Sequence, residues 1–171
     1  MKKLLNIALI SVFVLLIQGC GVISKSYVYE QQINKGDNSS EYSISLTPVN
    51  ASMRAGYSGF ILEINNNSKK EIEIDWNKTY FIDKGRTNGT FMFEGIVYKD
   101  RNNSKPSDIV FPEGIYSKLI YPNNYVVFNS AGGFSDWGHN GFGTGEFGIY
   151  LSLKIDNKEV KEKVIVKVKE Q

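Results

Sequence analysis

The sequence has few of the residues on which most catalytic and metal sites depend: it contains one cysteine, one histidine and four prolines among 171 residues. Because Cys20 is the only cysteine, an internal disulfide is excluded, and a zinc site built from several cysteine and histidine ligands is not expected. His139 is the only side chain whose ordinary pKa makes it a base near neutral pH. Ser135 and Asp136 lie close to His139 in sequence, but they lack the Gly-x-Ser-x-Gly spacing of a nucleophile elbow, so a catalytic triad is not predicted.

Three other chemical motifs are incomplete. Residues 100–104 place oxygen ligands at alternate positions, as a calcium loop does, but the sixth position is Lys105, where an EF-hand needs glycine. Residues 141–145 are rich in glycine, but the lysine and the following helix of a phosphate-binding loop are missing. The 18 acidic residues leave the carboxylate pair of a glycosidase neither excluded nor assignable. No metal or cofactor is therefore expected apart from covalent lipid.

The first twenty residues have the layout of an export signal. Lys2 and Lys3 form a charged start, and residues 4–17 form an apolar run of 14 residues that is broken only by Asn6 and Ser11. A helix that spans a bilayer needs roughly 18 or more apolar residues, so this run is too short for a permanent span. We expect residues 1–19 to be a signal peptide.

The end of this segment, Leu-Ile-Gln-Gly-Cys at 16–20, resembles the lipobox of bacterial lipoproteins. An aliphatic residue stands three positions before Cys20 and the small residue Gly19 stands directly before it, although Gln18 occupies a position where a small or β-branched residue is commoner. The resemblance implies cleavage between Gly19 and Cys20 and transfer of a diacylglyceryl group to the cysteine thiol. Two or more acyl chains would anchor the protein stably to a membrane, whereas a single chain gives only marginal binding.

The resemblance also implies a location in the cell envelope. In a Gram-negative host, Gly21 stands where lipoproteins retained at the inner membrane commonly carry aspartate, so the outer membrane is expected. In a Gram-positive host the same signal would leave the protein on the outer face of the plasma membrane.

Removal of residues 1–19 changes the charge balance. The discarded segment holds two lysines and no acid, so the remaining 152 residues carry 18 basic and 18 acidic side chains. A neutral chain offers no electrostatic attraction for nucleic acid, which favours clustered lysine and arginine. The expected partners are the membrane, through the lipid, and an envelope protein or glycan.

From residue 42 onward the apolar residues recur with period two, which is typical of half-buried strands. No stretch of twelve or more residues after Cys20 has a persuasive helical period, and short polar turns separate the alternating runs. Residues 20–41 are interpreted as a lipidated linker, with the alternative that 27–29 form a first strand. The clearest strands are predicted within 42–46, 60–64, 72–76, 91–93, 125–128, 147–155 and 164–168.

This pattern predicts an all-β domain over 42–171, an antiparallel sandwich or barrel, with an immunoglobulin-like sandwich of about seven to nine strands preferred. Trp76 is expected to be buried on a central strand. Residues 156–159 are expected to turn the final hairpin, whose lysines at 161, 163, 167 and 169 are typical of a protected edge strand.

The glycine-rich segment 131–146 is the main candidate site. It holds six glycines together with four aromatic side chains and reads as a long loop, a class that is often functional. The aromatic residues either present flat faces to a ligand or partner, or fold back to cap the end of the sandwich. The candidate binding residues are Phe134, Trp137, His139 and Phe142.

These observations favour a lipid-anchored envelope protein with a non-enzymatic binding domain. Two alternatives remain: an envelope glycan hydrolase that uses carboxylates, and a structural or assembly lipoprotein of an envelope complex. A pocket with two close acids would favour the hydrolase, and an apolar patch around Trp137 would favour binding.

Overall fold

A computed structural model describes residues 26–32, 40–50, 56–130 and 137–170 of the chain. Thirteen strands account for most of the regular structure: β1 (Tyr27–Gln32), β2 (Tyr42–Asn50), β3 (Tyr57–Asn66), β4 (Ile72–Ile74), β5 (Tyr80–Asp83), β6 (Arg86–Thr87), β7 (Phe91–Met92), β8 (Asp108–Val110), β9 (Ile115–Pro122), β10 (Val126–Phe128), β11 (Trp137–His139), β12 (Gly145–Ile155) and β13 (Lys158–Glu170). Three short 3-10 helices accompany them: η1 (Trp76–Lys78), η2 (Tyr98–Asp100) and η3 (Asn123–Tyr125).

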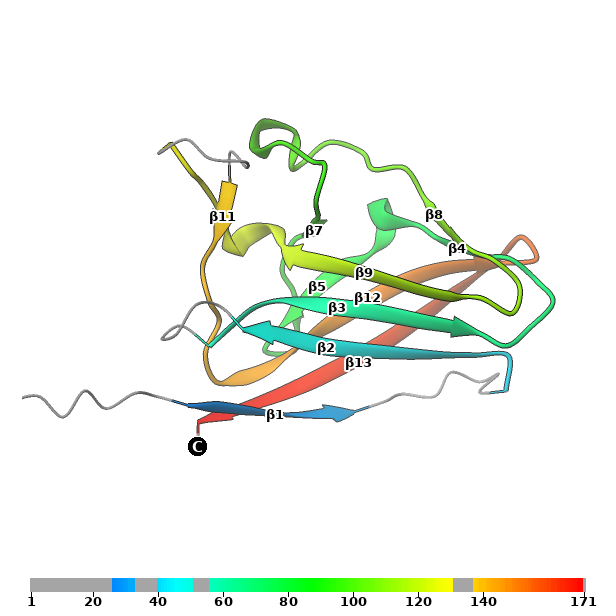
Figure 1. Cartoon of the computed structure of the whole chain (residues 1–171), viewed down its shortest axis with the longest axis horizontal. Coiled ribbons are helices and arrows are strands. Elements are labelled where there is room, and N and C mark those ends of the chain that lie inside the picture. The colour runs from blue at the N-terminus through cyan, green and yellow to red at the C-terminus, as the bar shows by residue number, and fades with distance from the viewer. Residues whose placement is uncertain (1–25, 33–39, 51–55, 131–136, 171) are drawn as a thin grey trace, which may run out of the picture.

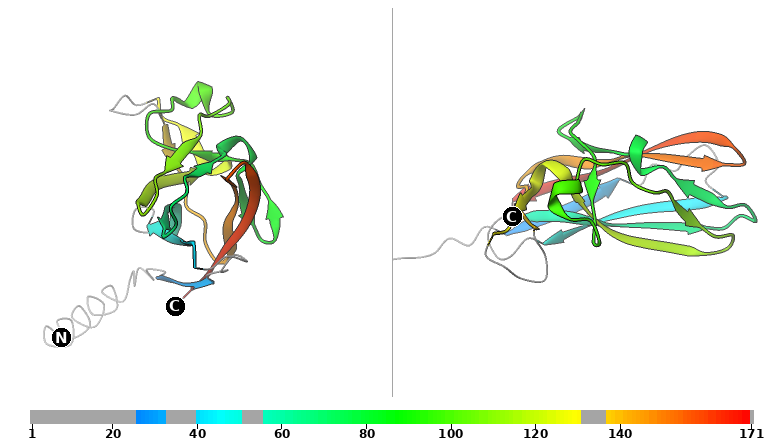
Figure 2. Two further views of the ribbon diagram at one scale, coloured as in Figure 1. Left: turned by 90° about the vertical axis from the view of Figure 1, so that its right-hand side faces the viewer. Right: turned by 90° about the horizontal axis from the view of Figure 1, so that it is seen from above.

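The strands form two facing antiparallel sheets (Figures 1 and 2). The larger sheet has the order β1-β13-β12-β4-β8, and β5 and β6 extend it beside β12. The smaller sheet has the order β2-β3-β9-β7, and β10 pairs separately with β11. The described residues contain no α-helix, so the predicted all-β, antiparallel class is confirmed.

A single apolar core lies between the sheets. Alternation explains it: in β3 the side chains of Phe60, Leu62 and Ile64 are fully buried, whereas Ile61 and Glu63 between them are exposed. Facing them across the core, β12 buries Ile149 and Leu151. Since each buried side chain of this size stabilises the fold by about 1.5 to 3 kcal/mol, this packing can hold the domain without a disulfide.

The last hairpin turns where expected. Asp156 and Asn157 join β12 to β13 with φ angles of 50° and 61°, the pair of positive values that a two-residue type I′ turn requires.

The edge-strand interpretation of the lysines holds only in part. Residues Ile165–Glu170 of β13 pair with β1, and residues 165–168 also pair with β12, so Lys167 lies between two strands and guards no edge.

Two sequence-based expectations need correction or completion at the N-terminal half. Trp76 is buried, with 1% of its surface exposed, but it lies in η1 and not on a strand, because the Asp75 side chain accepts a hydrogen bond from the Asn77 backbone and turns the chain out of β4. The alternative of a first strand near residue 27 is the correct one. β1 pairs with β13 over six residues, so the folded region begins before residue 42.

Candidate functional site

The glycine-rich segment 131–146 is not one continuous loop. Residues 137–139 form β11, which pairs with β10 through Val126↔His139 and Phe128↔Trp137. Phe134 lies outside the described residues, as do Ser135 and Asp136, which stand near His139 in sequence. The remaining candidates, Trp137, His139 and Phe142, occupy two different environments.

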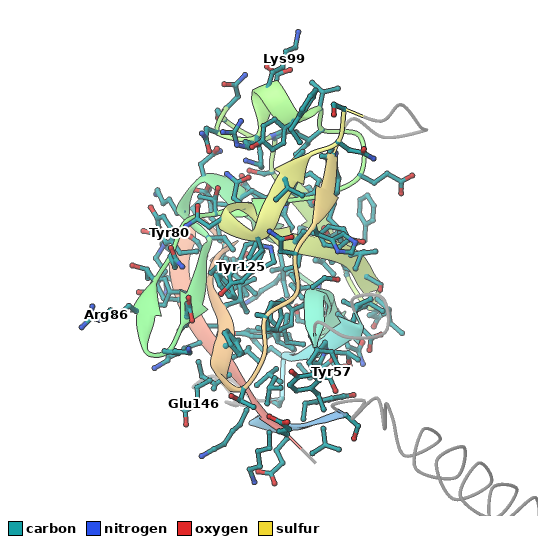
Figure 3. All side chains as sticks on the ribbon, turned by 90° about the vertical axis from the view of Figure 1, so that its left-hand side faces the viewer. Tyr57, Tyr80, Arg86, Lys99, Tyr125 and Glu146 are labelled. Atoms are coloured by element: carbon teal, nitrogen blue, oxygen red, sulfur yellow. The ribbon has the colours of Figure 1, made fainter. Side chains whose placement is uncertain are left out.

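Phe142 belongs to the core. Only 2% of its surface is exposed, and its ring lies 4.6 Å from the Phe147 ring and 5.2 Å from the Phe60 ring, centroid to centroid. Its backbone exchanges two hydrogen bonds with Tyr57, which fixes it at the end of β3. Tyr57 and Tyr125 lie at this same end of the sandwich, with Arg86 and Lys99 extending away from it (Figure 3). For Phe142 the capping alternative applies, and it cannot contact a ligand directly.

Trp137 and His139 lie on the outside of the smaller sheet, around Tyr121 of β9. The His139 ring is stacked on the Tyr121 ring at 4.8 Å with an interplanar angle of 11°, and the Trp137 ring meets Tyr121 edge-on at 5.3 Å. A Cβ atom at Gly59 would lie 2.8 Å from the Tyr121 ring, so only glycine at this β3 position lets the ring lie across the strand. We call Tyr121, Trp137 and His139 the aromatic cluster.

The aromatic cluster forms one wall of an open groove beside β9 with a volume of about 1060 Å³. The opposite wall is the segment that follows β7, which the Trp137 indole fixes by donating a hydrogen bond of 2.8 Å to the Ile96 carbonyl. Residues 117–119 of β9 form the base. The groove is lined by Phe93, Glu94, Gly95, Ile96, Val97, Ser117, Lys118, Leu119, Tyr121, Trp137, Gly138 and His139.

A charged network supports this groove from inside the sandwich. The Asp108 Oδ2 atom accepts hydrogen bonds from the Trp76 indole at 2.8 Å, the Tyr116 hydroxyl at 2.6 Å and the Lys118 ammonium at 2.5 Å. The Lys118 ammonium also lies 3.8 Å from the centre of the Phe93 ring, a cation–π contact. These contacts hold the Lys118 side chain of β9 in one position beside Asp108 of β8.

The network shifts the pKa values of Asp108 and Tyr116. Burial alone would raise the pKa of Asp108, but the hydrogen bonds from Lys118, Tyr116 and Trp76 outweigh burial and hold the pKa below its ordinary value. Burial and the neighbouring Asp108 carboxylate raise the pKa of Tyr116 far above its ordinary range. At neutral pH Asp108 is therefore a carboxylate and Tyr116 a neutral phenol.

The described lining of the groove includes His139 but does not provide the carboxylate pair of a glycosidase. Glu94 is the one acidic side chain among its described lining residues, whereas a glycosidase needs two carboxylates across the scissile bond. Most of the surface comes from aromatic and aliphatic side chains with a few polar groups. An arrangement of this kind is suited to binding a ligand or protein surface that is apolar or partly polar.

In the segment that resembles an incomplete calcium loop, the Lys105 side chain bonds to the carbonyl groups of the loop. The buried Lys105 ammonium donates hydrogen bonds to the carbonyls of Arg101 at 2.9 Å and Asn103 at 3.3 Å, and the Asp100 carboxylate accepts one from the Asn103 amide. Burial lowers the pKa of Lys105. Across the described ranges of the chain, no group of three or more His, Cys, Asp or Glu side chains could hold a metal ion.

Sequence reasoning did not identify Tyr121, the β9 residues at the base of the groove, or the segment 94–97. A signal for β9 was present: residues 115–121 form a run rich in isoleucine, leucine and tyrosine between Gly114 and Pro122. The groove itself has no sequence signal, because its walls come from three segments far apart in the chain.

Gly19 and Cys20, the predicted cleavage and lipid-attachment residues, lie outside the described residues. Within the described part of the chain, no helix is long and apolar enough to cross a membrane. The chain matches no model of a known protein family and shows no significant match to a curated protein.

Proposed function

We propose that this chain is a lipid-anchored protein of the bacterial cell envelope whose domain, an immunoglobulin-like sandwich, works by binding a partner and not by catalysis. The anchor is the lipid on Cys20, expected from the lipobox-like residues before it. The observation that carries the binding role is the groove beside β9, with its aromatic cluster and exposed Leu119. Sites of this composition recognise ligands or protein surfaces.

The proposal places the domain outside the cytoplasm. In a Gram-negative host the protein belongs to the outer membrane, and in a Gram-positive host to the outer face of the plasma membrane. The hydrolase alternative draws no support from the groove, which lacks a second acidic side chain among its described lining residues. The assembly alternative is compatible with the groove, because an assembly protein also works through its contacts.

A matched pair of substitutions tests the binding role. Leu119 and Ile109 are both strand residues with 40% of their surface exposed, but only Leu119 lines the groove. Leu119→Glu should lower the yield of cross-linked complexes in intact envelopes by about tenfold, the effect of losing 1.4 kcal/mol of binding free energy. Ile109→Glu should leave the yield unchanged.

Both variants should keep the stability of the unaltered protein to within about 0.5 kcal/mol, because exposed substitutions rarely do more. Chemical cross-linking in the envelope, followed by immunoblotting for this chain, gives the yield. Equal yields for the two variants would contradict the assignment of the groove as the binding site.

A further inference from the structure

Strand β9 has a free side along most of its length. β3 pairs with it over residues 115–120, but on its other side β7 pairs only with Tyr121 and Pro122. Beyond Met92 the chain turns away from β9: the Ile96 backbone donates a hydrogen bond to the Phe93 carbonyl, and Gly95 adopts a φ of 90°. The groove lies where the next strand of the sheet would otherwise run.

Two backbone hydrogen bonds establish which groups face this free side. Asn66 donates to the Gly114 carbonyl, so the even-numbered positions of β9 bond to β3, while Asn123 donates to the Thr90 carbonyl on the β7 side. Because antiparallel ladders alternate with period two, the N–H and C=O groups of Ile115, Ser117 and Leu119 point away from β3. Among the described residues these groups have no backbone partner.

Two of the other open sides of the sandwich, those of β2 and β13, carry features that oppose pairing. In β2, which forms the opposite edge of the smaller sheet, Asn67 donates to the Glu41 carbonyl, so even positions face outward and one of them is Pro48, which has no N–H to offer. The open half of β13 carries the exposed Lys161 and Lys163. β9 has neither protection at its outward positions.

We propose that a second copy of this chain pairs with this edge, so that β9 of one molecule lies antiparallel to β9 of the other about a two-fold axis at Ser117. The inference rests on the proposed function, because it names the partner that the groove receives. An interface of this kind uses the same surface on both molecules, as two-fold dimers do.

The side chains favour a copy over an unrelated strand. A two-fold axis at Ser117 places Ile115 opposite Leu119 of the copy, and these residues have 71% and 40% of their surfaces exposed in the single chain. On the inner face it places Lys118 opposite Tyr116 of the copy and not opposite a second lysine, so no like charges meet. Each contact occurs twice in the dimer.

The turn before β9 gives a second reason. It carries Phe111, which has 67% of its surface exposed. In this register Gly114 of the copy lies opposite Ile120, so the copy's turn leaves the ladder where β7 begins to pair with Tyr121, beside the groove to which Ile96 and Trp137 contribute apolar surface. A foreign strand would cover the groove but leave Phe111 in water, whereas a second copy covers both.

Cysteine cross-linking of the full-length protein in its envelope tests this arrangement. Ser117→Cys places two thiols across the axis with Cα atoms about 5.5 Å apart, within the range of about 4.4 to 6.8 Å that a disulfide needs. Glu63→Cys is the matched control, since Glu63 is exposed and is the β3 partner of Ser117. Its Cα would lie about 14 Å from that of its copy, three strand spacings away.

Under a mild oxidant, Ser117→Cys should give about tenfold more disulfide dimer than Glu63→Cys, because only the first pair meets the geometric requirement of a disulfide. The unaltered protein, which carries Cys20 alone, provides the background. Equal or background yields for Ser117→Cys would overturn the β9 pairing. If Leu119→Glu still lost its cross-linked complexes in that case, the proposed binding function would stand with a different partner. If neither variant differed from its control, both proposals would fail.

Discussion

Asp108 is the residue on which the edge of the sandwich depends most directly. Its Oδ2 atom accepts hydrogen bonds from Trp76 of η1 and from Tyr116 and Lys118 of β9. These bonds connect β8 to the strand that forms the base of the groove. Hydrogen bonds to a charged acceptor are roughly twice as strong as neutral ones. Loss of the charge should therefore be felt both in stability and in the placement of Lys118.

The depressed pKa of Asp108 fixes the direction of a pH effect. A carboxyl group with a lowered pKa in the folded state stabilises the protein above its unfolded pKa of about 3.9, and this contribution is lost as the pH falls through the folded-state pKa. Asp108→Asn has no charge to titrate. We expect the variant to be less stable than the unaltered protein at pH 7, with the difference shrinking below about pH 4.

Urea unfolding of both proteins at pH 7 and pH 3 measures this difference. Asp75→Asn is a suitable control, because Asp75 is a partly exposed acid next to Trp76 whose main contact is a cap of η1. A stability gap for Asp108→Asn that is as large at pH 3 as at pH 7 would show that the charge of Asp108 does not stabilise the fold.

Individual aromatic residues show the limit of sequence reasoning at this scale. Phe142 and Trp137 stand five positions apart in one glycine-rich segment, yet Phe142 is in the core and Trp137 lines the groove. The local pattern is the same for both, and only the distant residues that they meet, Phe60 and Tyr121, separate them. The burial of Trp76 was predictable from its size and position, but its place in a 3-10 helix depended on the Asp75 side chain.

At the scale of elements, the β12–β13 hairpin is the central unit of the larger sheet. Its strands pair over eleven residues, and β12 also pairs with β4 and β5 on its other side. Gly148 sits in the middle of this crowded strand, where a Cβ atom would lie 2.0 Å from the Val164 carbonyl oxygen. The backbone of β13 has little room to move away, because β1 holds its other side nearby.

Gly148→Ala should therefore destabilise the domain by about 1 to 3 kcal/mol, the usual cost of forcing extra atoms into a packed interior. Gly138→Ala in β11 is the matched control, since its Cβ would come no closer than 4.0 Å to a side chain. Thermal unfolding followed by circular dichroism gives both values. If the two variants melted at the same temperature, the close packing of β12 against β13 would be wrong.

The elements with clean alternation were predictable, and the others were not. β2, β3, β12 and β13 place apolar residues inward and polar residues outward, so the period of two marks them in sequence. β9 reverses this pattern over part of its length: its inner face includes Lys118, and its outer face carries Ile115 and Leu119. The residues of this strand, Ile-Tyr-Ser-Lys-Leu-Ile-Tyr at 115–121, therefore lack the alternation that would reveal which face is buried.

At the scale of the whole molecule, the sandwich class followed from composition and turn spacing, but the groove did not. The groove is assembled from β9, the segment after β7 and β11, and its base depends on the pairing of β9 with β3. Long-range pairing of this kind decides which residues come into contact, and it produces no pattern in the local sequence. The predicted N-terminal export signal is the opposite case, because the pattern that predicts it lies wholly within twenty consecutive residues.

Fatty-acid labelling with membrane fractionation tests most directly whether lipid on Cys20 holds the proposed binding domain on a membrane. The unaltered protein should incorporate labelled fatty acid and sediment with membranes, since two or more acyl chains give stable attachment. Cys20→Ser should incorporate none, because the sequence has no other thiol to accept the lipid, and it should accumulate as unprocessed or mislocalised precursor. Continued fatty-acid labelling of Cys20→Ser, with the same membrane distribution as the unaltered protein, would contradict the account.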